Sequence, residues 1–83
     1  MAKVVLYHTD GCHLCEQAYE LLSAHELVDS IEQRDIINDA AWLEAYQIRI
    51  PVLALAESSQ SVDLGWPFDY QSVTKFLKQY GSN

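Results

Sequence analysis

The sequence predicts an α/β fold, in which three helices cover a mixed four-stranded sheet in the order β-α-β-α-β-β-α. Three observations support this prediction. Four short segments are rich in β-branched and other apolar residues, three more carry apolar residues at helical spacing, and turn-forming residues separate them. Because 83 residues suffice for one small domain, residues 1–83 are expected to form a single domain.

A strand and then a helix are predicted near the N-terminus. Residues 3–8 alternate and are rich in β-branched and aromatic side chains, and Thr9-Asp10-Gly11 is typical of a turn. We expect a helix to begin at or beside Cys12, because apolar residues then recur at helical spacing, at Leu14, Ala18, Leu21 and Leu22.

The next two predicted elements are a strand within residues 27–37 and a helix from Ala40 to about Gln47. Residues in the strand alternate between two sides, one of which holds Ile31, Gln33 and Asp35. Either Asn38 or Asp39 can cap the helix. The helix is expected to pack three apolar side chains inward, those of Trp42, Leu43 and Tyr46.

Two strands and a helix complete the pattern. Residues 52–56 form a nearly uniform apolar run, which is typical of a strand buried on both faces, and residues 61–64 predict a fourth strand. Gly65-Trp66-Pro67 ends that strand, and residues 81–83 are interpreted as a loose tail. Between them lies an amphipathic helix, marked by Val73, Phe76, Leu77 and Tyr80.

The composition argues against two classes of partner. Twelve acidic and five basic side chains give a formal net charge of −7, so most of the surface is expected to repel nucleic acid. The apolar stretches are strand-sized, and the N-terminus enters a strand pattern without a signal-peptide cleavage site. We therefore expect no membrane association and a cytoplasmic location.

The two cysteines, Cys12 and Cys15, form a C-x-x-C motif between a predicted strand and a predicted helix. A disulfide that closes so short a loop removes little entropy from the unfolded chain, so stability is a poor reason for the pair. In a small cytosolic protein the motif favours a reversible dithiol–disulfide couple over a passive buried pair.

The two thiols are expected to have different roles. The start of a helix directs unpaired backbone N–H groups and the positive end of the helix dipole at Cys12, which favours its thiolate and makes it the expected nucleophile. Cys15 lies one turn further along, on the side shared with Ala18 and Leu22, and is expected to be the shielded resolving thiol.

Two neighbours of the motif can tune the ionisation of the Cys12 thiol. A protonated His13 would favour the thiolate, whereas Asp10, two residues before Cys12, would disfavour a nearby anion. A solvated side chain at the helix N-terminus is an equally good interpretation of His13.

Three segments of the chain together carry a family resemblance. They are residues 6–18 with Cys12 and Cys15, residues 49–53 with Ile50-Pro51, and residues 64–69 with Gly65-Trp66-Pro67. These segments resemble the glutaredoxin-like family of small bacterial proteins, so the resemblance implies a thioredoxin-like fold and a redox pair at the two cysteines. It also implies that Pro51 follows a cis peptide bond and faces that pair, whereas an X-Pro bond judged alone is expected to be trans. Ile50 would then offer its backbone to an incoming peptide or glutathione.

The chain departs from glutaredoxins at three places. Glutaredoxins commonly carry a basic residue shortly before the first cysteine, Thr-Val-Pro at the cis-proline and Gly-Gly-Asp after the fourth strand. This chain has Asp10, Arg49-Ile50-Pro51 and Gly65-Trp66-Pro67 there, so an atypical or absent glutathione site is expected.

Two side chains near these places are candidate substrate contacts. Arg49 is the candidate anchor for a substrate carboxylate, with a solvated surface charge as the alternative. Trp66 is either an apolar platform for a protein substrate or part of the core, whereas Phe68 is interpreted as core.

The expected function is a thiol–disulfide oxidoreductase that needs no cofactor or metal and acts on protein or small-molecule disulfides. Glutathione and a thioredoxin-type reductase are the candidate electron donors. One alternative is metal binding by the two cysteines and an imidazole from His8 or His13, although structural zinc sites take four protein ligands. Another is a non-catalytic adaptor that binds a partner through Trp66 and the acidic surface.

Overall fold

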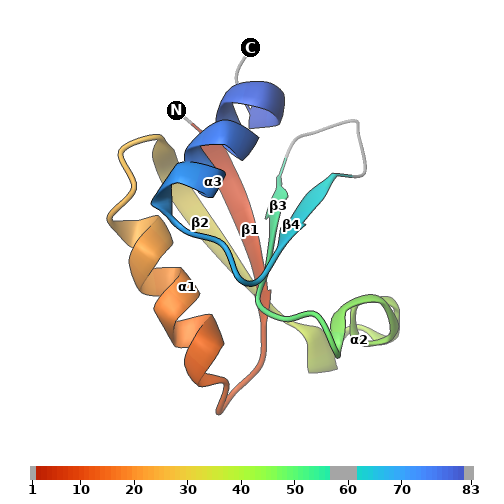
Figure 1. The fold of residues 1–83 in the computed structure, drawn as a ribbon. Helices are drawn as coiled ribbons and strands as arrows, with labels where there is room; N and C mark the ends of the chain where they lie inside the picture. Colours follow the sequence, from red (N-terminus) through yellow and green to blue (C-terminus); the bar gives the residue numbers. More distant parts are fainter. Residues whose placement is uncertain (1, 57–61, 82–83) are drawn as a thin grey trace.

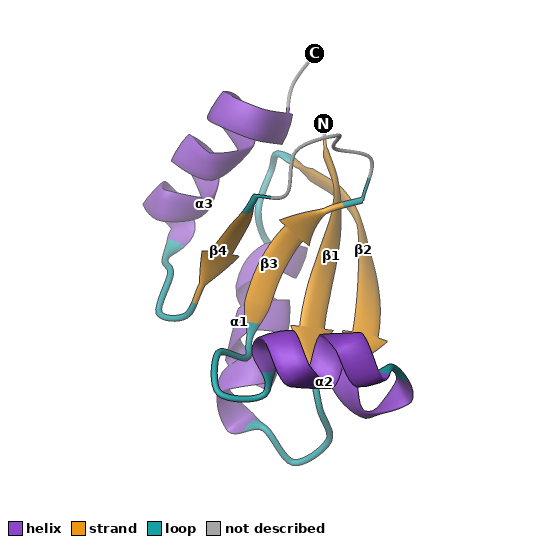
Figure 2. Ribbon diagram, turned by 90° about the vertical axis from the view of Figure 1, so that its right-hand side faces the viewer, coloured by secondary structure: helices purple, strands orange, loops and turns teal. Residues whose placement is uncertain are grey.

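The computed structural model describes residues 2–56 and 62–81, which form a mixed four-stranded sheet with helices on both faces (Figures 1 and 2). Strand β1 (Ala2–His8) is parallel to β2 (Val28–Asp35) and antiparallel to β3 (Val52–Leu55). Strand β4 (Asp63–Gly65) is antiparallel to β3, which gives the strand order β2-β1-β3-β4. The predicted element order and mixed sheet are confirmed.

The helices lie on opposite faces of the sheet. Figure 2 shows α2 (Ala40–Tyr46) in front of the strands and α1 (His13–Ser23) behind them. Helix α3 (Tyr70–Phe76) packs on the same face as α1 and continues into a π-helical turn, η2 (Leu77–Gly81). Of the described residues, none belongs to a helix with the length and apolar content needed to cross a bilayer.

Strand β1 supplies both hydrophobic cores, because successive side chains of a strand point to opposite faces. Val4 and Leu6 join the core that includes side chains of α1 and α3. Val5 and Tyr7 join a smaller core beneath α2, where Tyr46 stacks on Tyr7 with the ring centroids 4.3 Å apart.

Three apolar side chains that mark the predicted helices, including Leu43, which was expected to pack inward, are well exposed. Leu43 is 38% exposed, because the inward side of α2 is occupied by Trp42 and Tyr46, and the side chain of Leu43 turns away from it. Leu14 is 44% exposed, because the buried side of α1 carries Cys15, Ala18 and Leu22 instead. Tyr80 is 36% exposed and only flanks Phe76 from the π-helical turn.

Element boundaries follow local hydrogen bonds. Strand β2 ends at Asp35, whose carboxylate accepts the N–H of Ile37 and opens a 3₁₀ turn, η1 (Ile36–Asn38). Asp39 rather than Asn38 caps α2, by accepting the N–H groups of Ala41 and Trp42 at 2.8 and 3.3 Å. The predicted start of the fourth strand at Ser61 and the tail residues 82–83 lie outside the described residues.

The N-terminus of α3 is closed by a reciprocal capping box. The Asp69 carboxylate accepts the N–H of Ser72, and the Asp69 N–H donates to the Ser72 hydroxyl, both at 2.8 Å. The bond from the Ser72 backbone lowers the pKa of Asp69 below its ordinary value. The resulting stabilisation is therefore present above the unfolded-state pKa and is lost as the pH falls through the lower folded-state pKa.

We expect Asp69→Ala to lower the melting temperature at pH 7, and the difference from wild type to narrow below a pH of about 4, where the aspartate of the unfolded chain begins to bind protons. Thermal unfolding followed by circular dichroism between pH 3 and 7 measures this difference. Asp29→Ala, which removes an exposed carboxylate in β2, is the control. A difference for Asp69→Ala that does not change with pH would contradict the prediction.

Candidate functional site

Segments that are distant in the sequence meet at one end of the sheet. Strand β1 ends at His8, and the chain continues through residues 9–11 to the start of α1. Tyr7 pairs with Val52, and Val52 pairs with Gly65, so the neighbouring residues Pro51 and Trp66 lie at this same end. The N–H of Trp66 donates to the carbonyl of Pro51 at 3.2 Å, which joins these two segments directly.

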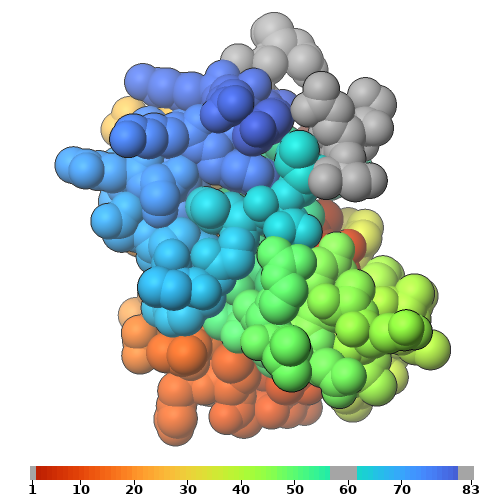
Figure 3. Space-filling model, turned by 45° about the vertical axis from the view of Figure 1, so that its right-hand side comes forward, coloured from red at the N-terminus to blue at the C-terminus, as the bar shows by residue number. Residues whose placement is uncertain are grey.

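The surface shows the same arrangement. In Figure 3 the orange atoms of α1 adjoin the green segment between α2 and β3, and the blue segment that follows β4 lies above α1 and beside the green segment. The Ile50–Pro51 and Trp66–Pro67 peptide bonds are both cis, and Pro51 is fully buried. The end of the sheet therefore combines the cysteine motif with both proline segments.

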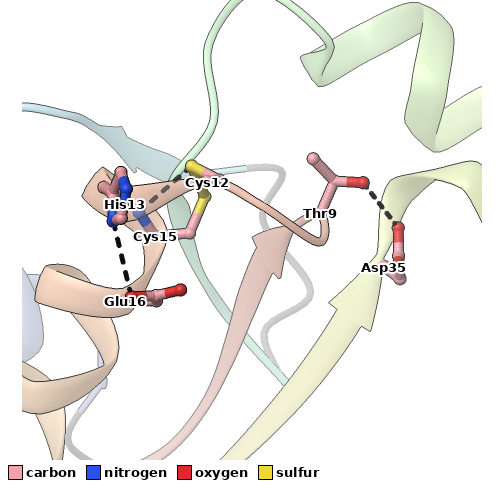
Figure 4. Close-up of a disulfide and its surroundings, with 6 residues drawn as sticks. All are labelled: Thr9, Cys12, His13, Cys15, Glu16 and Asp35. Carbon is pink, nitrogen blue, oxygen red and sulfur yellow. Dashed lines mark hydrogen bonds and ion pairs between the residues drawn. A yellow bond between two sulfur atoms is a disulfide. The ribbon is translucent and has the colours of Figure 1, made fainter.

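The loop from β1 to α1 is held in a defined shape. Gly11 has φ of +80°, a conformation that side-chain-bearing residues rarely adopt, and it turns the chain into the helix. The Thr9 hydroxyl donates to Asp35 Oδ1 at 3.1 Å, which ties the loop to the end of β2 (Figure 4). The turn at Gly11 and the hydrogen bond of Thr9 together orient the next residue, Cys12.

Cys12 is the N-cap residue of α1. Its backbone is extended, with φ −92° and ψ 102°, its carbonyl accepts the first helical hydrogen bond from Glu16, and its Sγ accepts the N–H of Cys15 at 3.1 Å. A disulfide joins Cys12 and Cys15, whose Cα atoms are 5.2 Å apart (Figure 4). The helix N-terminus therefore directs an N–H group at the sulfur of Cys12, as expected from the sequence.

The two sulfur-bearing side chains differ in accessibility. Cys12 is half-buried, whereas Cys15 is only 4% exposed and lies on the buried side of α1 with Ala18 and Leu22. Cys12 is therefore the more accessible of the two cysteines, while Cys15 is shielded by the fold.

The two predicted tuning residues both lie at the surface. The His13 side chain is 91% exposed, and its Nδ1 is 3.7 Å from Glu16 Oε1. Asp10 is also exposed and lines a pocket next to the disulfide. His13 is therefore solvated and lies directly after Cys12, at the first residue of α1.

This pocket has a volume of about 390 Å³ and includes both cysteines in its lining. Helix α1 contributes three residues that the sequence analysis did not single out, namely Glu16, Tyr19 and Glu20. Helical spacing could have identified them, because they follow Cys12 by one and two turns on the same side of the helix.

Arg49 is paired within the protein. Its guanidinium donates to both carboxylate oxygens of Asp63, at 2.6 and 3.3 Å, and lies 5.7 Å from the centroid of the Tyr46 ring. The hydrogen bond to Asp63 raises the pKa of Arg49 above its ordinary value. Asp63 therefore occupies the Nη1 and Nη2 end of the guanidinium.

Trp66 is partly exposed and partly packed on the core. It is half-buried and makes an edge contact with Phe68, with ring centroids 5.0 Å apart, so part of its surface packs on the core. Phe68 is 6% exposed, which confirms its interpretation as core.

The metal-binding alternative required the cysteines and an imidazole to converge. Across residues 2–56 and 62–81, no group of three or more histidine, cysteine, aspartate or glutamate side chains is placed to hold a metal ion. His8 lines the pocket with the cysteines, but these side chains do not form such a group.

Comparisons with known proteins agree with this geometry. The model of the Glutaredoxin-like domain (DUF836) family matches residues 3–78. An X-ray structure of the structural genomics target protein XcR50 from X. campestris is 36% identical, with a TM-score of 0.75, covering 92% of this chain and 96% of that chain. A solution structure of XcR50 is 37% identical, with a TM-score of 0.75, covering 95% of each chain. No curated protein matches. The match over most of the chain, the shared fold and the C-x-x-C disulfide show that this chain belongs to the glutaredoxin-like domain family of the thioredoxin superfamily.

Proposed function

We propose that the protein is a thiol–disulfide oxidoreductase in which Cys12 is the nucleophile and Cys15 the resolving thiol. The observation that carries this proposal is the asymmetry of the pair. Cys12 is accessible at the N-cap of α1 and receives a backbone N–H bond, whereas Cys15 is 4% exposed. A helix N-terminus of this kind favours the thiolate, which is the attacking species in disulfide exchange.

The reaction proceeds in two exchange steps. The Cys12 thiolate attacks one sulfur of a substrate disulfide, which forms a mixed disulfide and releases the other half as a thiolate. The Cys15 thiol, after losing its proton, attacks Sγ of Cys12, which releases the second substrate thiolate and closes the Cys12–Cys15 disulfide. The substrate gains two electrons, and an external thiol reductant returns two electrons to the protein.

The surrounding residues have supporting roles in this proposal. The backbone of Ile50, before Pro51, positions the substrate chain at the end of the sheet where Cys12 lies. His13 favours the Cys12 thiolate when protonated, and Asp10 opposes it. Substrates are protein or small-molecule disulfides in the cytoplasm, and the reductant is glutathione or a thioredoxin-type reductase.

A redox titration tests the proposal. The protein is equilibrated with glutathione buffers under nitrogen in the presence of chelator, the free thiols are alkylated, and modified cysteines are counted by mass spectrometry. We expect Cys12 and Cys15 to oxidise together, with a two-electron midpoint between about −270 and −120 mV, the range of dedicated oxidoreductases. A Cys12–Cys15 disulfide that stays oxidised in buffers with potentials well below about −300 mV, as structural disulfides do, would contradict the proposed function.

A further inference from the structure

The pocket beside the Cys12–Cys15 disulfide carries an excess of negative charge. Three of its lining residues are acidic, namely Asp10, Glu16 and Glu20, and all three are exposed. Its lining, within the part of the chain that the structure describes, includes no lysine or arginine. A charged group that enters this pocket next to the disulfide therefore meets carboxylates.

The lysine and arginine side chains of the protein lie elsewhere, and the basic groups at the pocket are the imidazoles of His8, which lines it, and His13, which is 3.7 Å from Glu16. Two of the five lysines and arginines are paired with acidic neighbours, because Arg34 pairs with Glu32 and Arg49 with Asp63. The other three belong to β1 and to the C-terminal helical segment, at Lys3, Lys75 and Lys78. None of the five lines the pocket, so they do not offset its carboxylates at short range.

The acidic residues are arranged along the approach to the reactive sulfur. Glu16 and Glu20 are one helical turn apart, and Glu16 is one turn beyond Cys12, so the carboxylates line the side of α1 that begins at the disulfide. Figure 4 shows Glu16 on the turn of α1 next to the two sulfur atoms. Tyr19 lines the same pocket and is 40% exposed, and the face of a tyrosine ring attracts cations.

We propose that this pocket selects positively charged disulfides, in which an ammonium or guanidinium group lies within a few bonds of the sulfur that Cys12 attacks. The inference rests on the proposed oxidoreductase function and names its substrate class. Each close charge pair at a solvated surface changes affinity by about fivefold, so two carboxylates give a preference of tenfold or more. Glutathione disulfide, with more carboxylates than ammonium groups, is then a disfavoured substrate.

Three small disulfides of nearly equal chain length provide the test. Cystamine carries an ammonium group at each end, bis(2-hydroxyethyl) disulfide is neutral, and 3,3′-dithiodipropionate carries a carboxylate at each end. Reduced protein, freed of reductant, is mixed with each one, and closure of the Cys12–Cys15 disulfide is followed by acid quench, alkylation and mass spectrometry. Each rate constant is divided by that of 2-mercaptoethanol with the same disulfide, which removes differences between leaving thiols.

We expect the normalised rate constant for cystamine to exceed that for 3,3′-dithiodipropionate by about tenfold at low ionic strength, and by less at 0.5 M salt. The Glu16→Gln/Glu20→Gln variant should lower this ratio at least about threefold. The control Glu26→Gln/Asp29→Asn removes the same charge at the opposite end of α1 and of the sheet and should leave the ratio unchanged. The same rate is measured for a cyclic peptide whose cystine is flanked by lysines and for its glutamate-flanked counterpart. A faster reaction of the lysine peptide shows that the charge preference extends from small molecules to peptide substrates.

Two results would overturn the inference while leaving the proposed function intact. One is equal normalised rates for the three disulfides, and the other is an equal loss of preference in both double variants, which would assign the preference to overall charge. If none of the disulfides oxidises the protein in a reaction that requires Cys12, the oxidoreductase function and the substrate class are overturned together.

Discussion

Cys12→Ser is expected to lower the rate of disulfide reduction at least about 1,000-fold, to that of the uncatalysed reaction. A serine hydroxyl does not ionise near neutral pH and forms no disulfide. Cys15 cannot replace Cys12 as the attacking thiol, because it is 4% exposed on the side of α1 that packs on the core. Turnover of a chromogenic aryl disulfide, with dithiothreitol as the reductant, measures the loss.

Cys15→Ser is the matched control, since it makes the same sulfur-to-oxygen replacement one helical turn away. This variant keeps the Cys12 thiolate and is expected to accumulate the mixed disulfide with substrate, visible by mass spectrometry as the added mass of half the substrate. Retained turnover in Cys12→Ser, or failure of Cys15→Ser to form the mixed disulfide while the fold is intact, would contradict the assigned roles.

Leu53→Ala is expected to lower the free energy of unfolding by about 3 kcal/mol, the largest stability effect that we predict. Leu53 is 0% exposed and lies in β3 between Leu6 of β1 and Leu64 of β4. Its truncation removes buried apolar surface and leaves a cavity in the core beneath α1 and α3. Because the free energy of unfolding of a native protein is only about 5–15 kcal/mol, this loss is a large fraction of the total stability.

Urea unfolding of the oxidised protein measures this effect. Leu43→Ala is the matched control, because it removes the same atoms from a leucine that is 38% exposed on α2, and it should change the free energy by about 0.5 kcal/mol or less. Equal losses in the two variants would contradict the placement of Leu53 at the centre of the sheet.

Features governed by neighbouring residues could be predicted from the sequence. Hydrophobic spacing predicted the order of strands and helices, and Asp39 was one of the two cap residues expected for α2. The position of Cys12 at the start of α1 followed from the turn residues before it, of which Gly11 adopts the positive φ. The buried side of α1, with Cys15, Ala18 and Leu22, followed from the helical repeat.

Packing choices between similar side chains could not be predicted in this way. Leu43 and Trp42 are adjacent and both apolar, and only the position of Tyr7 beneath α2 decides that Trp42 and Tyr46 pack inward. The same limit applies to Arg49, because its partner Asp63 is distant in the sequence and becomes a neighbour only through the pairing of β3 with β4.

The fold class, the C-x-x-C motif and the resemblance to glutaredoxin-like proteins could be predicted from the sequence alone, since each depends on local spacing or on residue identity. The surroundings of the motif arise from tertiary contacts. The tertiary structure placed Pro51 and Trp66 at the end of the sheet where α1 begins, occupied the Arg49 guanidinium with Asp63, and formed an acidic pocket beside the disulfide. These outcomes depend on contacts between segments far apart in the chain, which no local pattern encodes.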